Sequence, residues 1–191
     1  MDAKLAITQL QAWVAQVVVK YNLCPFARRE VESNSIRYVA AEGPTEHLLQ
    51  QLLDECLLLQ QQPSVATTLI ALPRGYEGFF DYLDLLNIAE QLLEAEGFTG
   101  EFQLASFHPD YCFADSPQHD AANFTNRAPV PALHILREAQ LEQALAEYDE
   151  PESIPDRNIA FARRKGAEFF VQLLAHITSS AAAPNKPNNP H

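Results

Sequence analysis

Short β-prone segments alternate with long helical ones along most of this chain, and this order restricts the folds that it can adopt. Residues 65–72, VATTLIAL, form a continuous β-prone run that is typical of a strand covered on both faces. Apolar side chains recur at helical spacing before this run, from Thr45 to Pro63, and after it, up to Gly97. The alternation predicts βαβ units, in which helices pack on a sheet.

Alternating apolar residues mark the remaining strands, and apolar residues at helical spacing mark the remaining helices. Strands are expected at residues 35–40, 102–107 and 132–137, and helices at 3–21, 138–147 and from 155 to about 177. The expected class is therefore α/β: a single domain over residues 1–178, with about four strands in a mainly parallel or mixed sheet flanked by helices. Residues 179–191, SSAAAPNKPNNPH, have low complexity and predict a disordered tail.

Charge narrows the range of partners. Thirteen Lys and Arg residues oppose 25 Asp and Glu residues, for a net charge of -12. This balance disfavours nucleic acids and anionic membrane surfaces, which attract basic proteins. The sequence has neither a signal peptide nor an apolar run of the ~20 residues that span a bilayer, and its three irregularly spaced cysteines suit reduced thiols. We therefore expect a soluble bacterial cytoplasmic protein, with a small anionic molecule as candidate partner.

Polar turns follow three of the expected strands, at residues 42–45, 73–75 and 108–110. The carboxyl ends of parallel strands share one edge of a sheet, where ligands usually bind. We therefore consider Arg74 a candidate for binding an anionic substrate and His108 a candidate general acid or base. The alternative for His108 is a structural hydrogen bond to the loop backbone.

A long loop at residues 108–131 precedes the last strand, and loops of this length are more often functional than accidental. Asn126 and Arg127, near its end, are candidates for binding a carboxylate or phosphate. The alternative for Arg127 is an ion pair that fixes the loop. His134, within the strand, is a further binding candidate, and its alternative is a core histidine with satisfied hydrogen bonds.

Cys24 lies in the segment NLCPFARR, where Arg28 and Arg29 follow it closely. Nearby positive charge favours the thiolate, so Cys24 is a candidate nucleophile or redox thiol; the alternative is a small buried side chain. Cys56 continues a leucine face at helical spacing and is expected to pack in the core. Among the basic residues of the final helix, Arg157 alone lies near its start, where it could contribute to a site.

Motifs for metals and nucleotides are missing from the sequence. His108 and Cys112 are four residues apart, but no paired CxxC or HExxH spacing accompanies them, so no metal site is predicted. Neither a G-x-G-x-x-G motif, a P-loop nor a G-x-S-x-G elbow occurs. The sequence therefore leaves any cofactor, and the oligomeric state, undetermined.

Three segments together resemble one bacterial family. NLCPFA at residues 22–27, ASFHPDY at 105–111 and TNRAPVPALHILRE at 125–138 are similar to a family catalogued as a domain of unknown function, number fourteen-fifteen. The likeness extends from Ala3 to about Leu174 and implies a residue signature without an established activity. The signature falls on Asn22, Cys24, Pro25, Phe26, His108, Pro109, Asn126, Arg127, Pro129, Pro131, His134 and Arg137.

Two residues depart from that signature: Cys112 stands where the family has glutamine, and Val130 where it has an aromatic residue. The first departure weakens any mechanism that needs Cys112. Three hypotheses follow. The first is an enzyme for a small anionic metabolite, with Cys24 as nucleophile, His108 as acid–base group, and Asn126 with Arg127 as anchor. The second is a non-enzymatic module that binds a small ligand or a protein. The third is a thiol redox protein.

Overall fold

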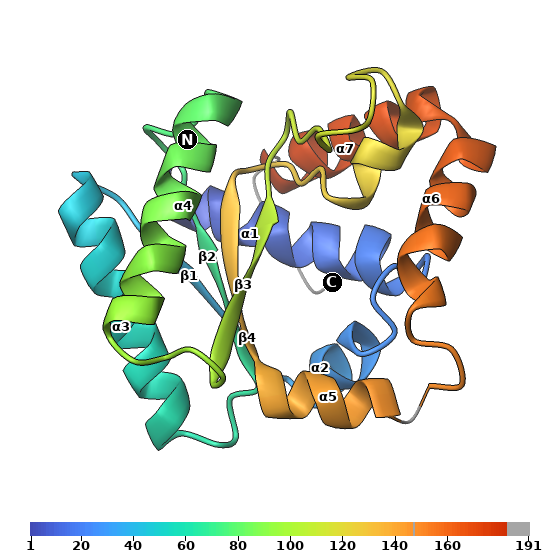
Figure 1. Ribbon diagram of the computed structural model, residues 1–191. Helices are drawn as coiled ribbons and strands as arrows, with labels where there is room; N and C mark the ends of the chain where they lie inside the picture. The colour runs from blue at the N-terminus through green and yellow to red at the C-terminus, as the bar shows by residue number, and fades with distance from the viewer. Residues whose placement is uncertain (147, 183–191) are drawn as a thin grey trace, which may run out of the picture.

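The computed structural model describes residues 1–146 and 148–182 and arranges them around a four-stranded sheet (Figure 1). The strands are β1 (Ile36–Ala40), β2 (Thr67–Ala71), β3 (Phe102–Phe107) and β4 (Ala132–Arg137), in the spatial order β1-β2-β4-β3. β1 and β2 are parallel, whereas β4 is antiparallel to both β2 and β3. The sheet is mixed, and the predicted α/β class is confirmed.

The connections explain these directions. Helix α3 (Thr45–Gln61) links β1 to β2, and α4 (Phe79–Ala95) links β2 to β3, so each of these strands starts from the same end of the sheet. The loop at residues 108–131, with its short 3-10 helix η2 (Ala121–Thr125), joins β3 to β4. β4 therefore begins where β3 ends and runs back between β2 and β3.

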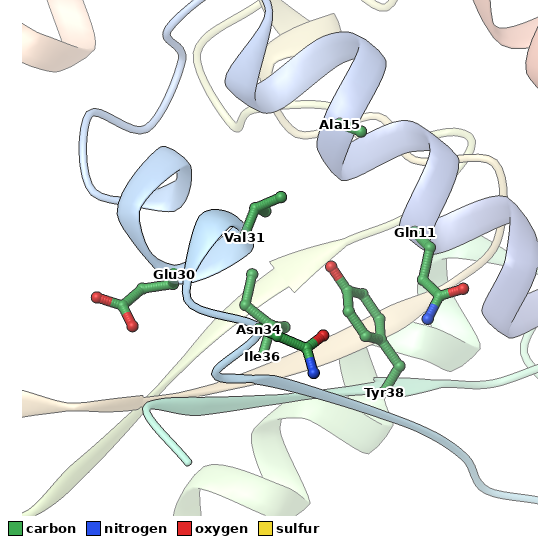
Figure 2. A pocket seen from close by; sticks show the side chains of 7 residues that line it. All are labelled: Gln11, Ala15, Glu30, Val31, Asn34, Ile36 and Tyr38. Carbon is green, nitrogen blue, oxygen red and sulfur yellow. The ribbon is translucent and has the colours of Figure 1, made fainter. Parts of the chain in front are cut away.

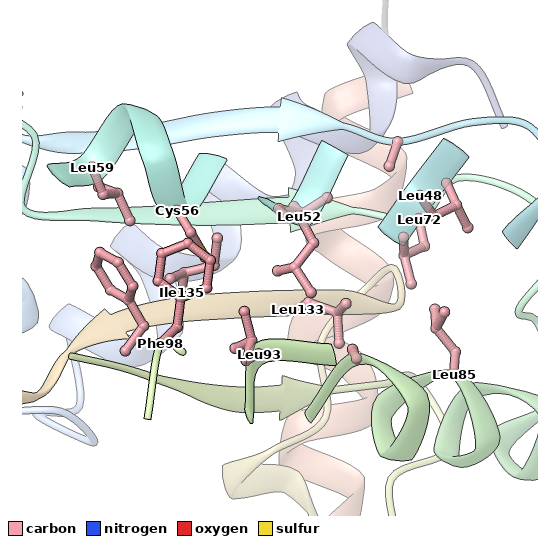
Figure 3. Packing of buried hydrophobic residues seen from close by; sticks show 14 of the residues in the cluster. Leu48, Leu52, Cys56, Leu59, Leu72, Leu85, Leu93, Phe98, Leu133 and Ile135 are labelled. Atoms are coloured by element: carbon pink, nitrogen blue, oxygen red, sulfur yellow. The ribbon is translucent and has the colours of Figure 1, made fainter. Parts of the chain in front are cut away.

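One face of the sheet is covered by α3 and α4. Figure 3 shows Leu52 and Cys56 of α3 and Leu93 of α4 packed against Leu133 and Ile135 of β4, and all five side chains are buried. Burying a leucine-sized side chain contributes about 1.5–3 kcal/mol, so this cluster is a main source of stability. The prediction that Cys56 packs in the core is confirmed.

The opposite face packs against helix α1 (Ala3–Trp13), which crosses the strands, and helix α7 (Ala167–Ala182), which lies along α1 (Figure 1). The Trp13 and Phe107 rings pack edge to face, with 4.9 Å between centroids. Leu69 of β2 and Ile177 of α7 are buried in the same cluster. Each helix in the described ranges is too short or too polar to cross a bilayer.

Helices α5 (Glu138–Ala146) and α6 (Ser153–Lys165) follow β4. α6 stands beside η2, and the Arg163 guanidinium binds the Asp120 carboxylate, with Nη2 to Oδ2 at 2.7 Å. Phe124 of η2 stacks on Phe170 of α7 at 5.4 Å, so apolar and charged contacts both tie the long loop to the C-terminal helices.

The helices differ from the prediction in three places. The expected opening helix changes after Trp13 into a π-helix, η1 (Val14–Val19), where three consecutive valines are weak helix formers. Helix α2 (Ala27–Glu32) was not predicted, because six residues are too few for a periodic pattern. The single final helix was wrong: Gly166 separates α6 from α7, and α7 continues to Ala182. Residues 183–191 of the predicted tail lie outside the described ranges.

Gly166→Ala should destabilise the protein by about 1–3 kcal/mol. Gly166 has φ 83° and ψ 153°, a conformation that costs other residues about that much, and no atom lies near the added methyl group to compensate. Urea unfolding should therefore show a lower midpoint at unchanged slope. Glu168→Ala, an exposed change on α7, is the control. Equal midpoints for the two variants would contradict the backbone argument.

Candidate functional site

The three polar turns after β1, β2 and β3 meet at one edge of the sheet. The hydroxyl groups of Thr45 and Tyr76 lie 2.9 Å apart, joining the first turn to the second. The Tyr76 carbonyl accepts a hydrogen bond from His108 Nε2 at 3.0 Å, joining the second turn to the third. These contacts follow from the common direction of the three strands.

His108 is fully buried at this edge, and both of its ring nitrogens are occupied. Nε2 donates to the Tyr76 carbonyl, and Nδ1 accepts from the Asp110 amide at 3.0 Å. The ring lies 5.2 Å from Phe79 and 5.1 Å from Tyr82, between centroids. Burial lowers the pKa of His108, so the neutral form is favoured. These contacts match the structural alternative for this histidine.

Arg127 and Asn126 bind the backbone of their own loop and its neighbouring strand. Arg127 Nε donates to the Tyr111 carbonyl at 2.9 Å, and its Nη2 donates to the Gln118 carbonyl at 2.8 Å. Asn126 Nδ2 donates to the Ser106 carbonyl at 3.2 Å. These hydrogen bonds fix the loop. The alternative for Arg127 was an ion pair with the same effect, but the partners of Arg127 are backbone carbonyl groups and not a carboxylate.

Arg74 is exposed at the same edge. Its Nε donates to the Met1 carbonyl at 3.3 Å and lies 4.0 Å from a Glu42 carboxylate oxygen. An exposed pair at this distance adds little to stability. A role for Arg74 in substrate binding stays a prediction.

His134 projects from β4 toward the α1 side of the sheet. Thr67 Oγ1 donates to the Ile135 carbonyl and therefore accepts from His134 Nε2, at 2.6 Å. These two hydrogen bonds together require the His134 tautomer that carries its proton on Nε2. Burial lowers the pKa of His134 from 6.5 to about 4. The Thr67 contact matches the alternative of a satisfied core histidine, and a binding role stays a prediction.

Cys24 lies between η1 and α2, half-buried. Burial is the main influence on its thiol and raises the pKa, in spite of hydrogen bonding from the backbone of Phe26 and Ala27. Leu23, just before it, packs in the cluster on the α1 side of the sheet, whereas His108 packs on Phe79 and Tyr82 of α4. Within the described ranges no hydrogen bond joins Cys24 to His108, and the catalytic centre formed by these two residues stays a prediction.

The segment before Cys24 instead forms a hollow with α6, which we call the α6 pocket. It has a volume of about 270 Å³. Its lining residues come from the turn that follows η1 and from one face of α6: Tyr21, Asn22, Arg157, Asn158, Ala160, Phe161 and Arg164.

Hydrogen bonds between the two elements hold the α6 pocket together. Arg157 Nη2 donates to the Asn22 carbonyl at 2.8 Å, and Asn158 Nδ2 donates to the Leu23 carbonyl at 2.6 Å. Asn22 has φ 53°, a left-handed conformation that asparagine tolerates and that turns the chain sharply toward α6. The sharp turn of the chain at Asn22 therefore creates the α6 pocket.

Two guanidinium groups give the α6 pocket a positive lining. Arg164 lies over the Phe161 ring at 5.7 Å, and Arg157 keeps Nη1 and Nε free of the Asn22 contact. Neither forms an ion pair with a carboxylate in the part of the chain that the structure describes. Two cations without paired anions are suited to an anionic ligand.

No group of three metal-ligating side chains in residues 1–146 and 148–182 is arranged to hold a metal ion. Cys112, the departure noted above, lies with its Sγ 3.3 Å from the Ser116 carbonyl. The Cys112 thiol therefore forms a hydrogen bond within its own loop.

A family model described as "Protein of unknown function (DUF1415)" matches residues 5–172. The chain belongs to the DUF1415 family. The match confirms the resemblance, and it includes every residue of the α6 pocket. Comparisons with curated proteins and with solved structures give no match for this DUF1415 protein.

Sequence reasoning had identified Asn22 as part of the DUF1415 signature and Arg157 as the cation at the start of the last helix. It missed Tyr21 and Phe161, and it counted Arg164 only among the basic residues on a solvated face of the final helix. Arg157, Phe161 and Arg164 recur at helical spacing on α6, so they share one face, and this was the available signal. The approach of this face to residue 22 is a long-range contact that no local pattern predicts.

At pH 7, iodoacetamide should alkylate Cys24 of this DUF1415 protein more slowly than the same cysteine in the urea-unfolded chain. Burial raises the pKa of the thiol and so reduces the reactive thiolate. Peptide mass spectrometry would give the rate for Cys24 separately from Cys56 and Cys112. Alkylation faster in the folded protein would instead support the nucleophile hypothesis.

Acidification from pH 7 to pH 4 should lower the free energy of unfolding, in part through His134. Its pKa is about 4 in the folded protein against 6.5 ordinarily, so the unfolded chain takes up the proton first as the pH falls. The full shift corresponds to roughly 3 kcal/mol, and we expect about 2 kcal/mol because the side chain is partly exposed.

The contribution of His134 can be isolated with His134→Gln, which keeps a hydrogen-bond donor for Thr67. Chemical unfolding at several pH values should show a smaller loss of stability in this variant between pH 6.5 and pH 4. His119→Gln, which removes an exposed imidazole, is the matched control. If both variants follow the wild-type profile, His134 is not responsible.

Proposed function

We propose that this protein binds a small dianion, such as a phosphate or a dicarboxylate, in the α6 pocket. The observation that carries the proposal is the pair of arginines, Arg157 and Arg164, in a hollow of about 270 Å³ without a carboxylate partner among the described residues. This volume is close to the lower end of the range of small-ligand pockets.

The spacing of the two arginines suits a ligand with two negative charges. Seven residues correspond to about 10 Å along a helix axis, and both long side chains can turn toward a point between them. Arg157 is already oriented by the Asn22 carbonyl, so less side-chain entropy is lost when it binds. Tyr21 and the Asn22 side chain add neutral hydrogen-bonding groups for the uncharged part of the ligand.

The neighbouring residues favour binding over catalysis. Both ring nitrogens of His108 are occupied, which leaves it poorly suited to proton transfer. The raised pKa of Cys24 opposes its use as a nucleophile or a redox thiol. The enzyme and redox hypotheses stay proposals without a favouring observation. The free state of Cys24, Cys56 and Cys112 agrees with the cytoplasmic location that we propose.

Isothermal titration calorimetry with inorganic phosphate, and then with succinate, tests the proposal. Wild-type protein should bind one dianion per chain, and Arg164→Ala should weaken binding about tenfold or more, because a hydrogen bond to a charged group contributes about 1.5–3 kcal/mol. Arg157→Ala should weaken it at least as much, since it also loses the bond to Asn22.

The matched control is Arg29→Ala, which removes the same charge from a side chain that is 82% exposed on α2. It should bind dianions as wild type does. Loss of affinity in all three variants would mean that only overall charge matters, and failure of wild type to bind any dianion would refute the proposal. Consumption of the bound ligand would support the enzyme hypothesis instead.

A further inference from the structure

A second hollow lies between α1, α2 and the edge strand β1, and we call it the β1 pocket (Figure 2). Its volume is about 190 Å³. The lining residues are Gln11, Ala15, Glu30, Val31, Asn34, Ile36 and Tyr38. It is separate from the α6 pocket, with which it shares no lining residue.

Three neutral polar side chains converge in the β1 pocket. In Figure 2 the carboxamides of Gln11 and Asn34 lie on either side of the Tyr38 ring. Asn34 has φ 53°, so the chain turns sharply there before β1 begins. Among the described residues none of these three side chains forms a hydrogen bond, which leaves two amide groups and one hydroxyl group available to a ligand.

The charge of the β1 pocket differs from that of the α6 pocket. Glu30 is its only charged lining residue, and its carboxylate accepts a hydrogen bond from Ser35 and points away from Tyr38 in Figure 2. Burial raises the pKa of Tyr38 to about 12, so its hydroxyl stays protonated at neutral pH. The lining residues therefore offer an anion no positive charge and present neutral donors and acceptors.

We propose that the β1 pocket binds a small neutral molecule that carries a carboxamide or urea group. Such a group has donors and an acceptor in one plane, and it can satisfy the amides of Gln11 and Asn34 and the Tyr38 hydroxyl at once. Val31 and Ile36 supply apolar contact for the rest of the molecule. The volume holds about six water-sized groups, which limits the ligand to a few non-hydrogen atoms.

Titration with propionamide, followed by ¹H–¹⁵N NMR, tests the inference on the full chain. The side-chain amide signals of Gln11 and Asn34 should shift in a saturable way, with Kd of the order of millimolar for so small a ligand. Propionate, which has the same size and a negative charge, is the ligand control and should leave these signals unchanged.

Tyr38→Phe should raise the Kd for propionamide about fivefold, as expected for one lost hydrogen bond. Gln11→Leu should do the same, while Arg164→Ala, in the α6 pocket, should leave it unchanged and so separates this inference from the proposed dianion site. Equal responses to propionamide and propionate would overturn the inference. So would unsaturable shifts in wild type, or an unchanged Kd in both pocket variants.

Discussion

Hydrogen bonds from arginine side chains to backbone carbonyl groups hold the irregular parts of this fold in place. A carbonyl that leaves the regular bonding of a helix or strand needs another donor, and a guanidinium group supplies several at once. Arg137 binds the carbonyl of Leu59 in the last turn of α3 and that of Val65 just before β2. Arg127 does so within the long loop, and Arg157 at the corner after η1. Each bond joins segments that are distant in sequence or irregular in shape.

This use of arginine shows why a polar loop residue is an ambiguous sign of a site. A polar residue in a loop can serve a ligand or the loop itself, and both uses favour the same residue types. His108 and Arg127 each bind two backbone groups, which accounts for their chemistry without a ligand. Arg157 differs, because its contacts to Asn22 and Asn158 both use Nη2, and the residue lines the α6 pocket.

The sequence allowed prediction of the strands and long helices because their patterns are local. All four strands were located to within two residues at either end, since alternation or a continuous β-prone run marked each one. The break at Gly166 was missed because the apolar pattern continues from α6 into α7. The π-helical turns of η1 were missed for a similar reason, since Val14 and Val17 continue the buried apolar pattern of α1.

The candidate site was harder to predict because it depends on contacts between distant segments. Cys24, His108 and Arg127 are recognisable as residue types, but whether they meet is decided by the path of the chain. α1 carries the Cys24 segment across one side of the sheet, while α4 and its neighbours enclose His108 on the other. Arg164 lies 140 residues or more from the segment it approaches, so only the assembled fold places it beside Tyr21 and Asn22.

A net charge of -12 raises the question of how such a protein could bind the proposed dianion. The distance between the charges determines how strongly they interact. At physiological ionic strength charges more than about 8 Å apart are largely screened, so most carboxylates act weakly at the α6 pocket. Arg157 and Arg164 would contact the proposed dianion directly, where screening is small and hydrogen bonds are directional. The same net charge discourages extended polyanions, which would contact the acidic surface as well, and it thereby favours a ligand small enough to meet only the two arginines.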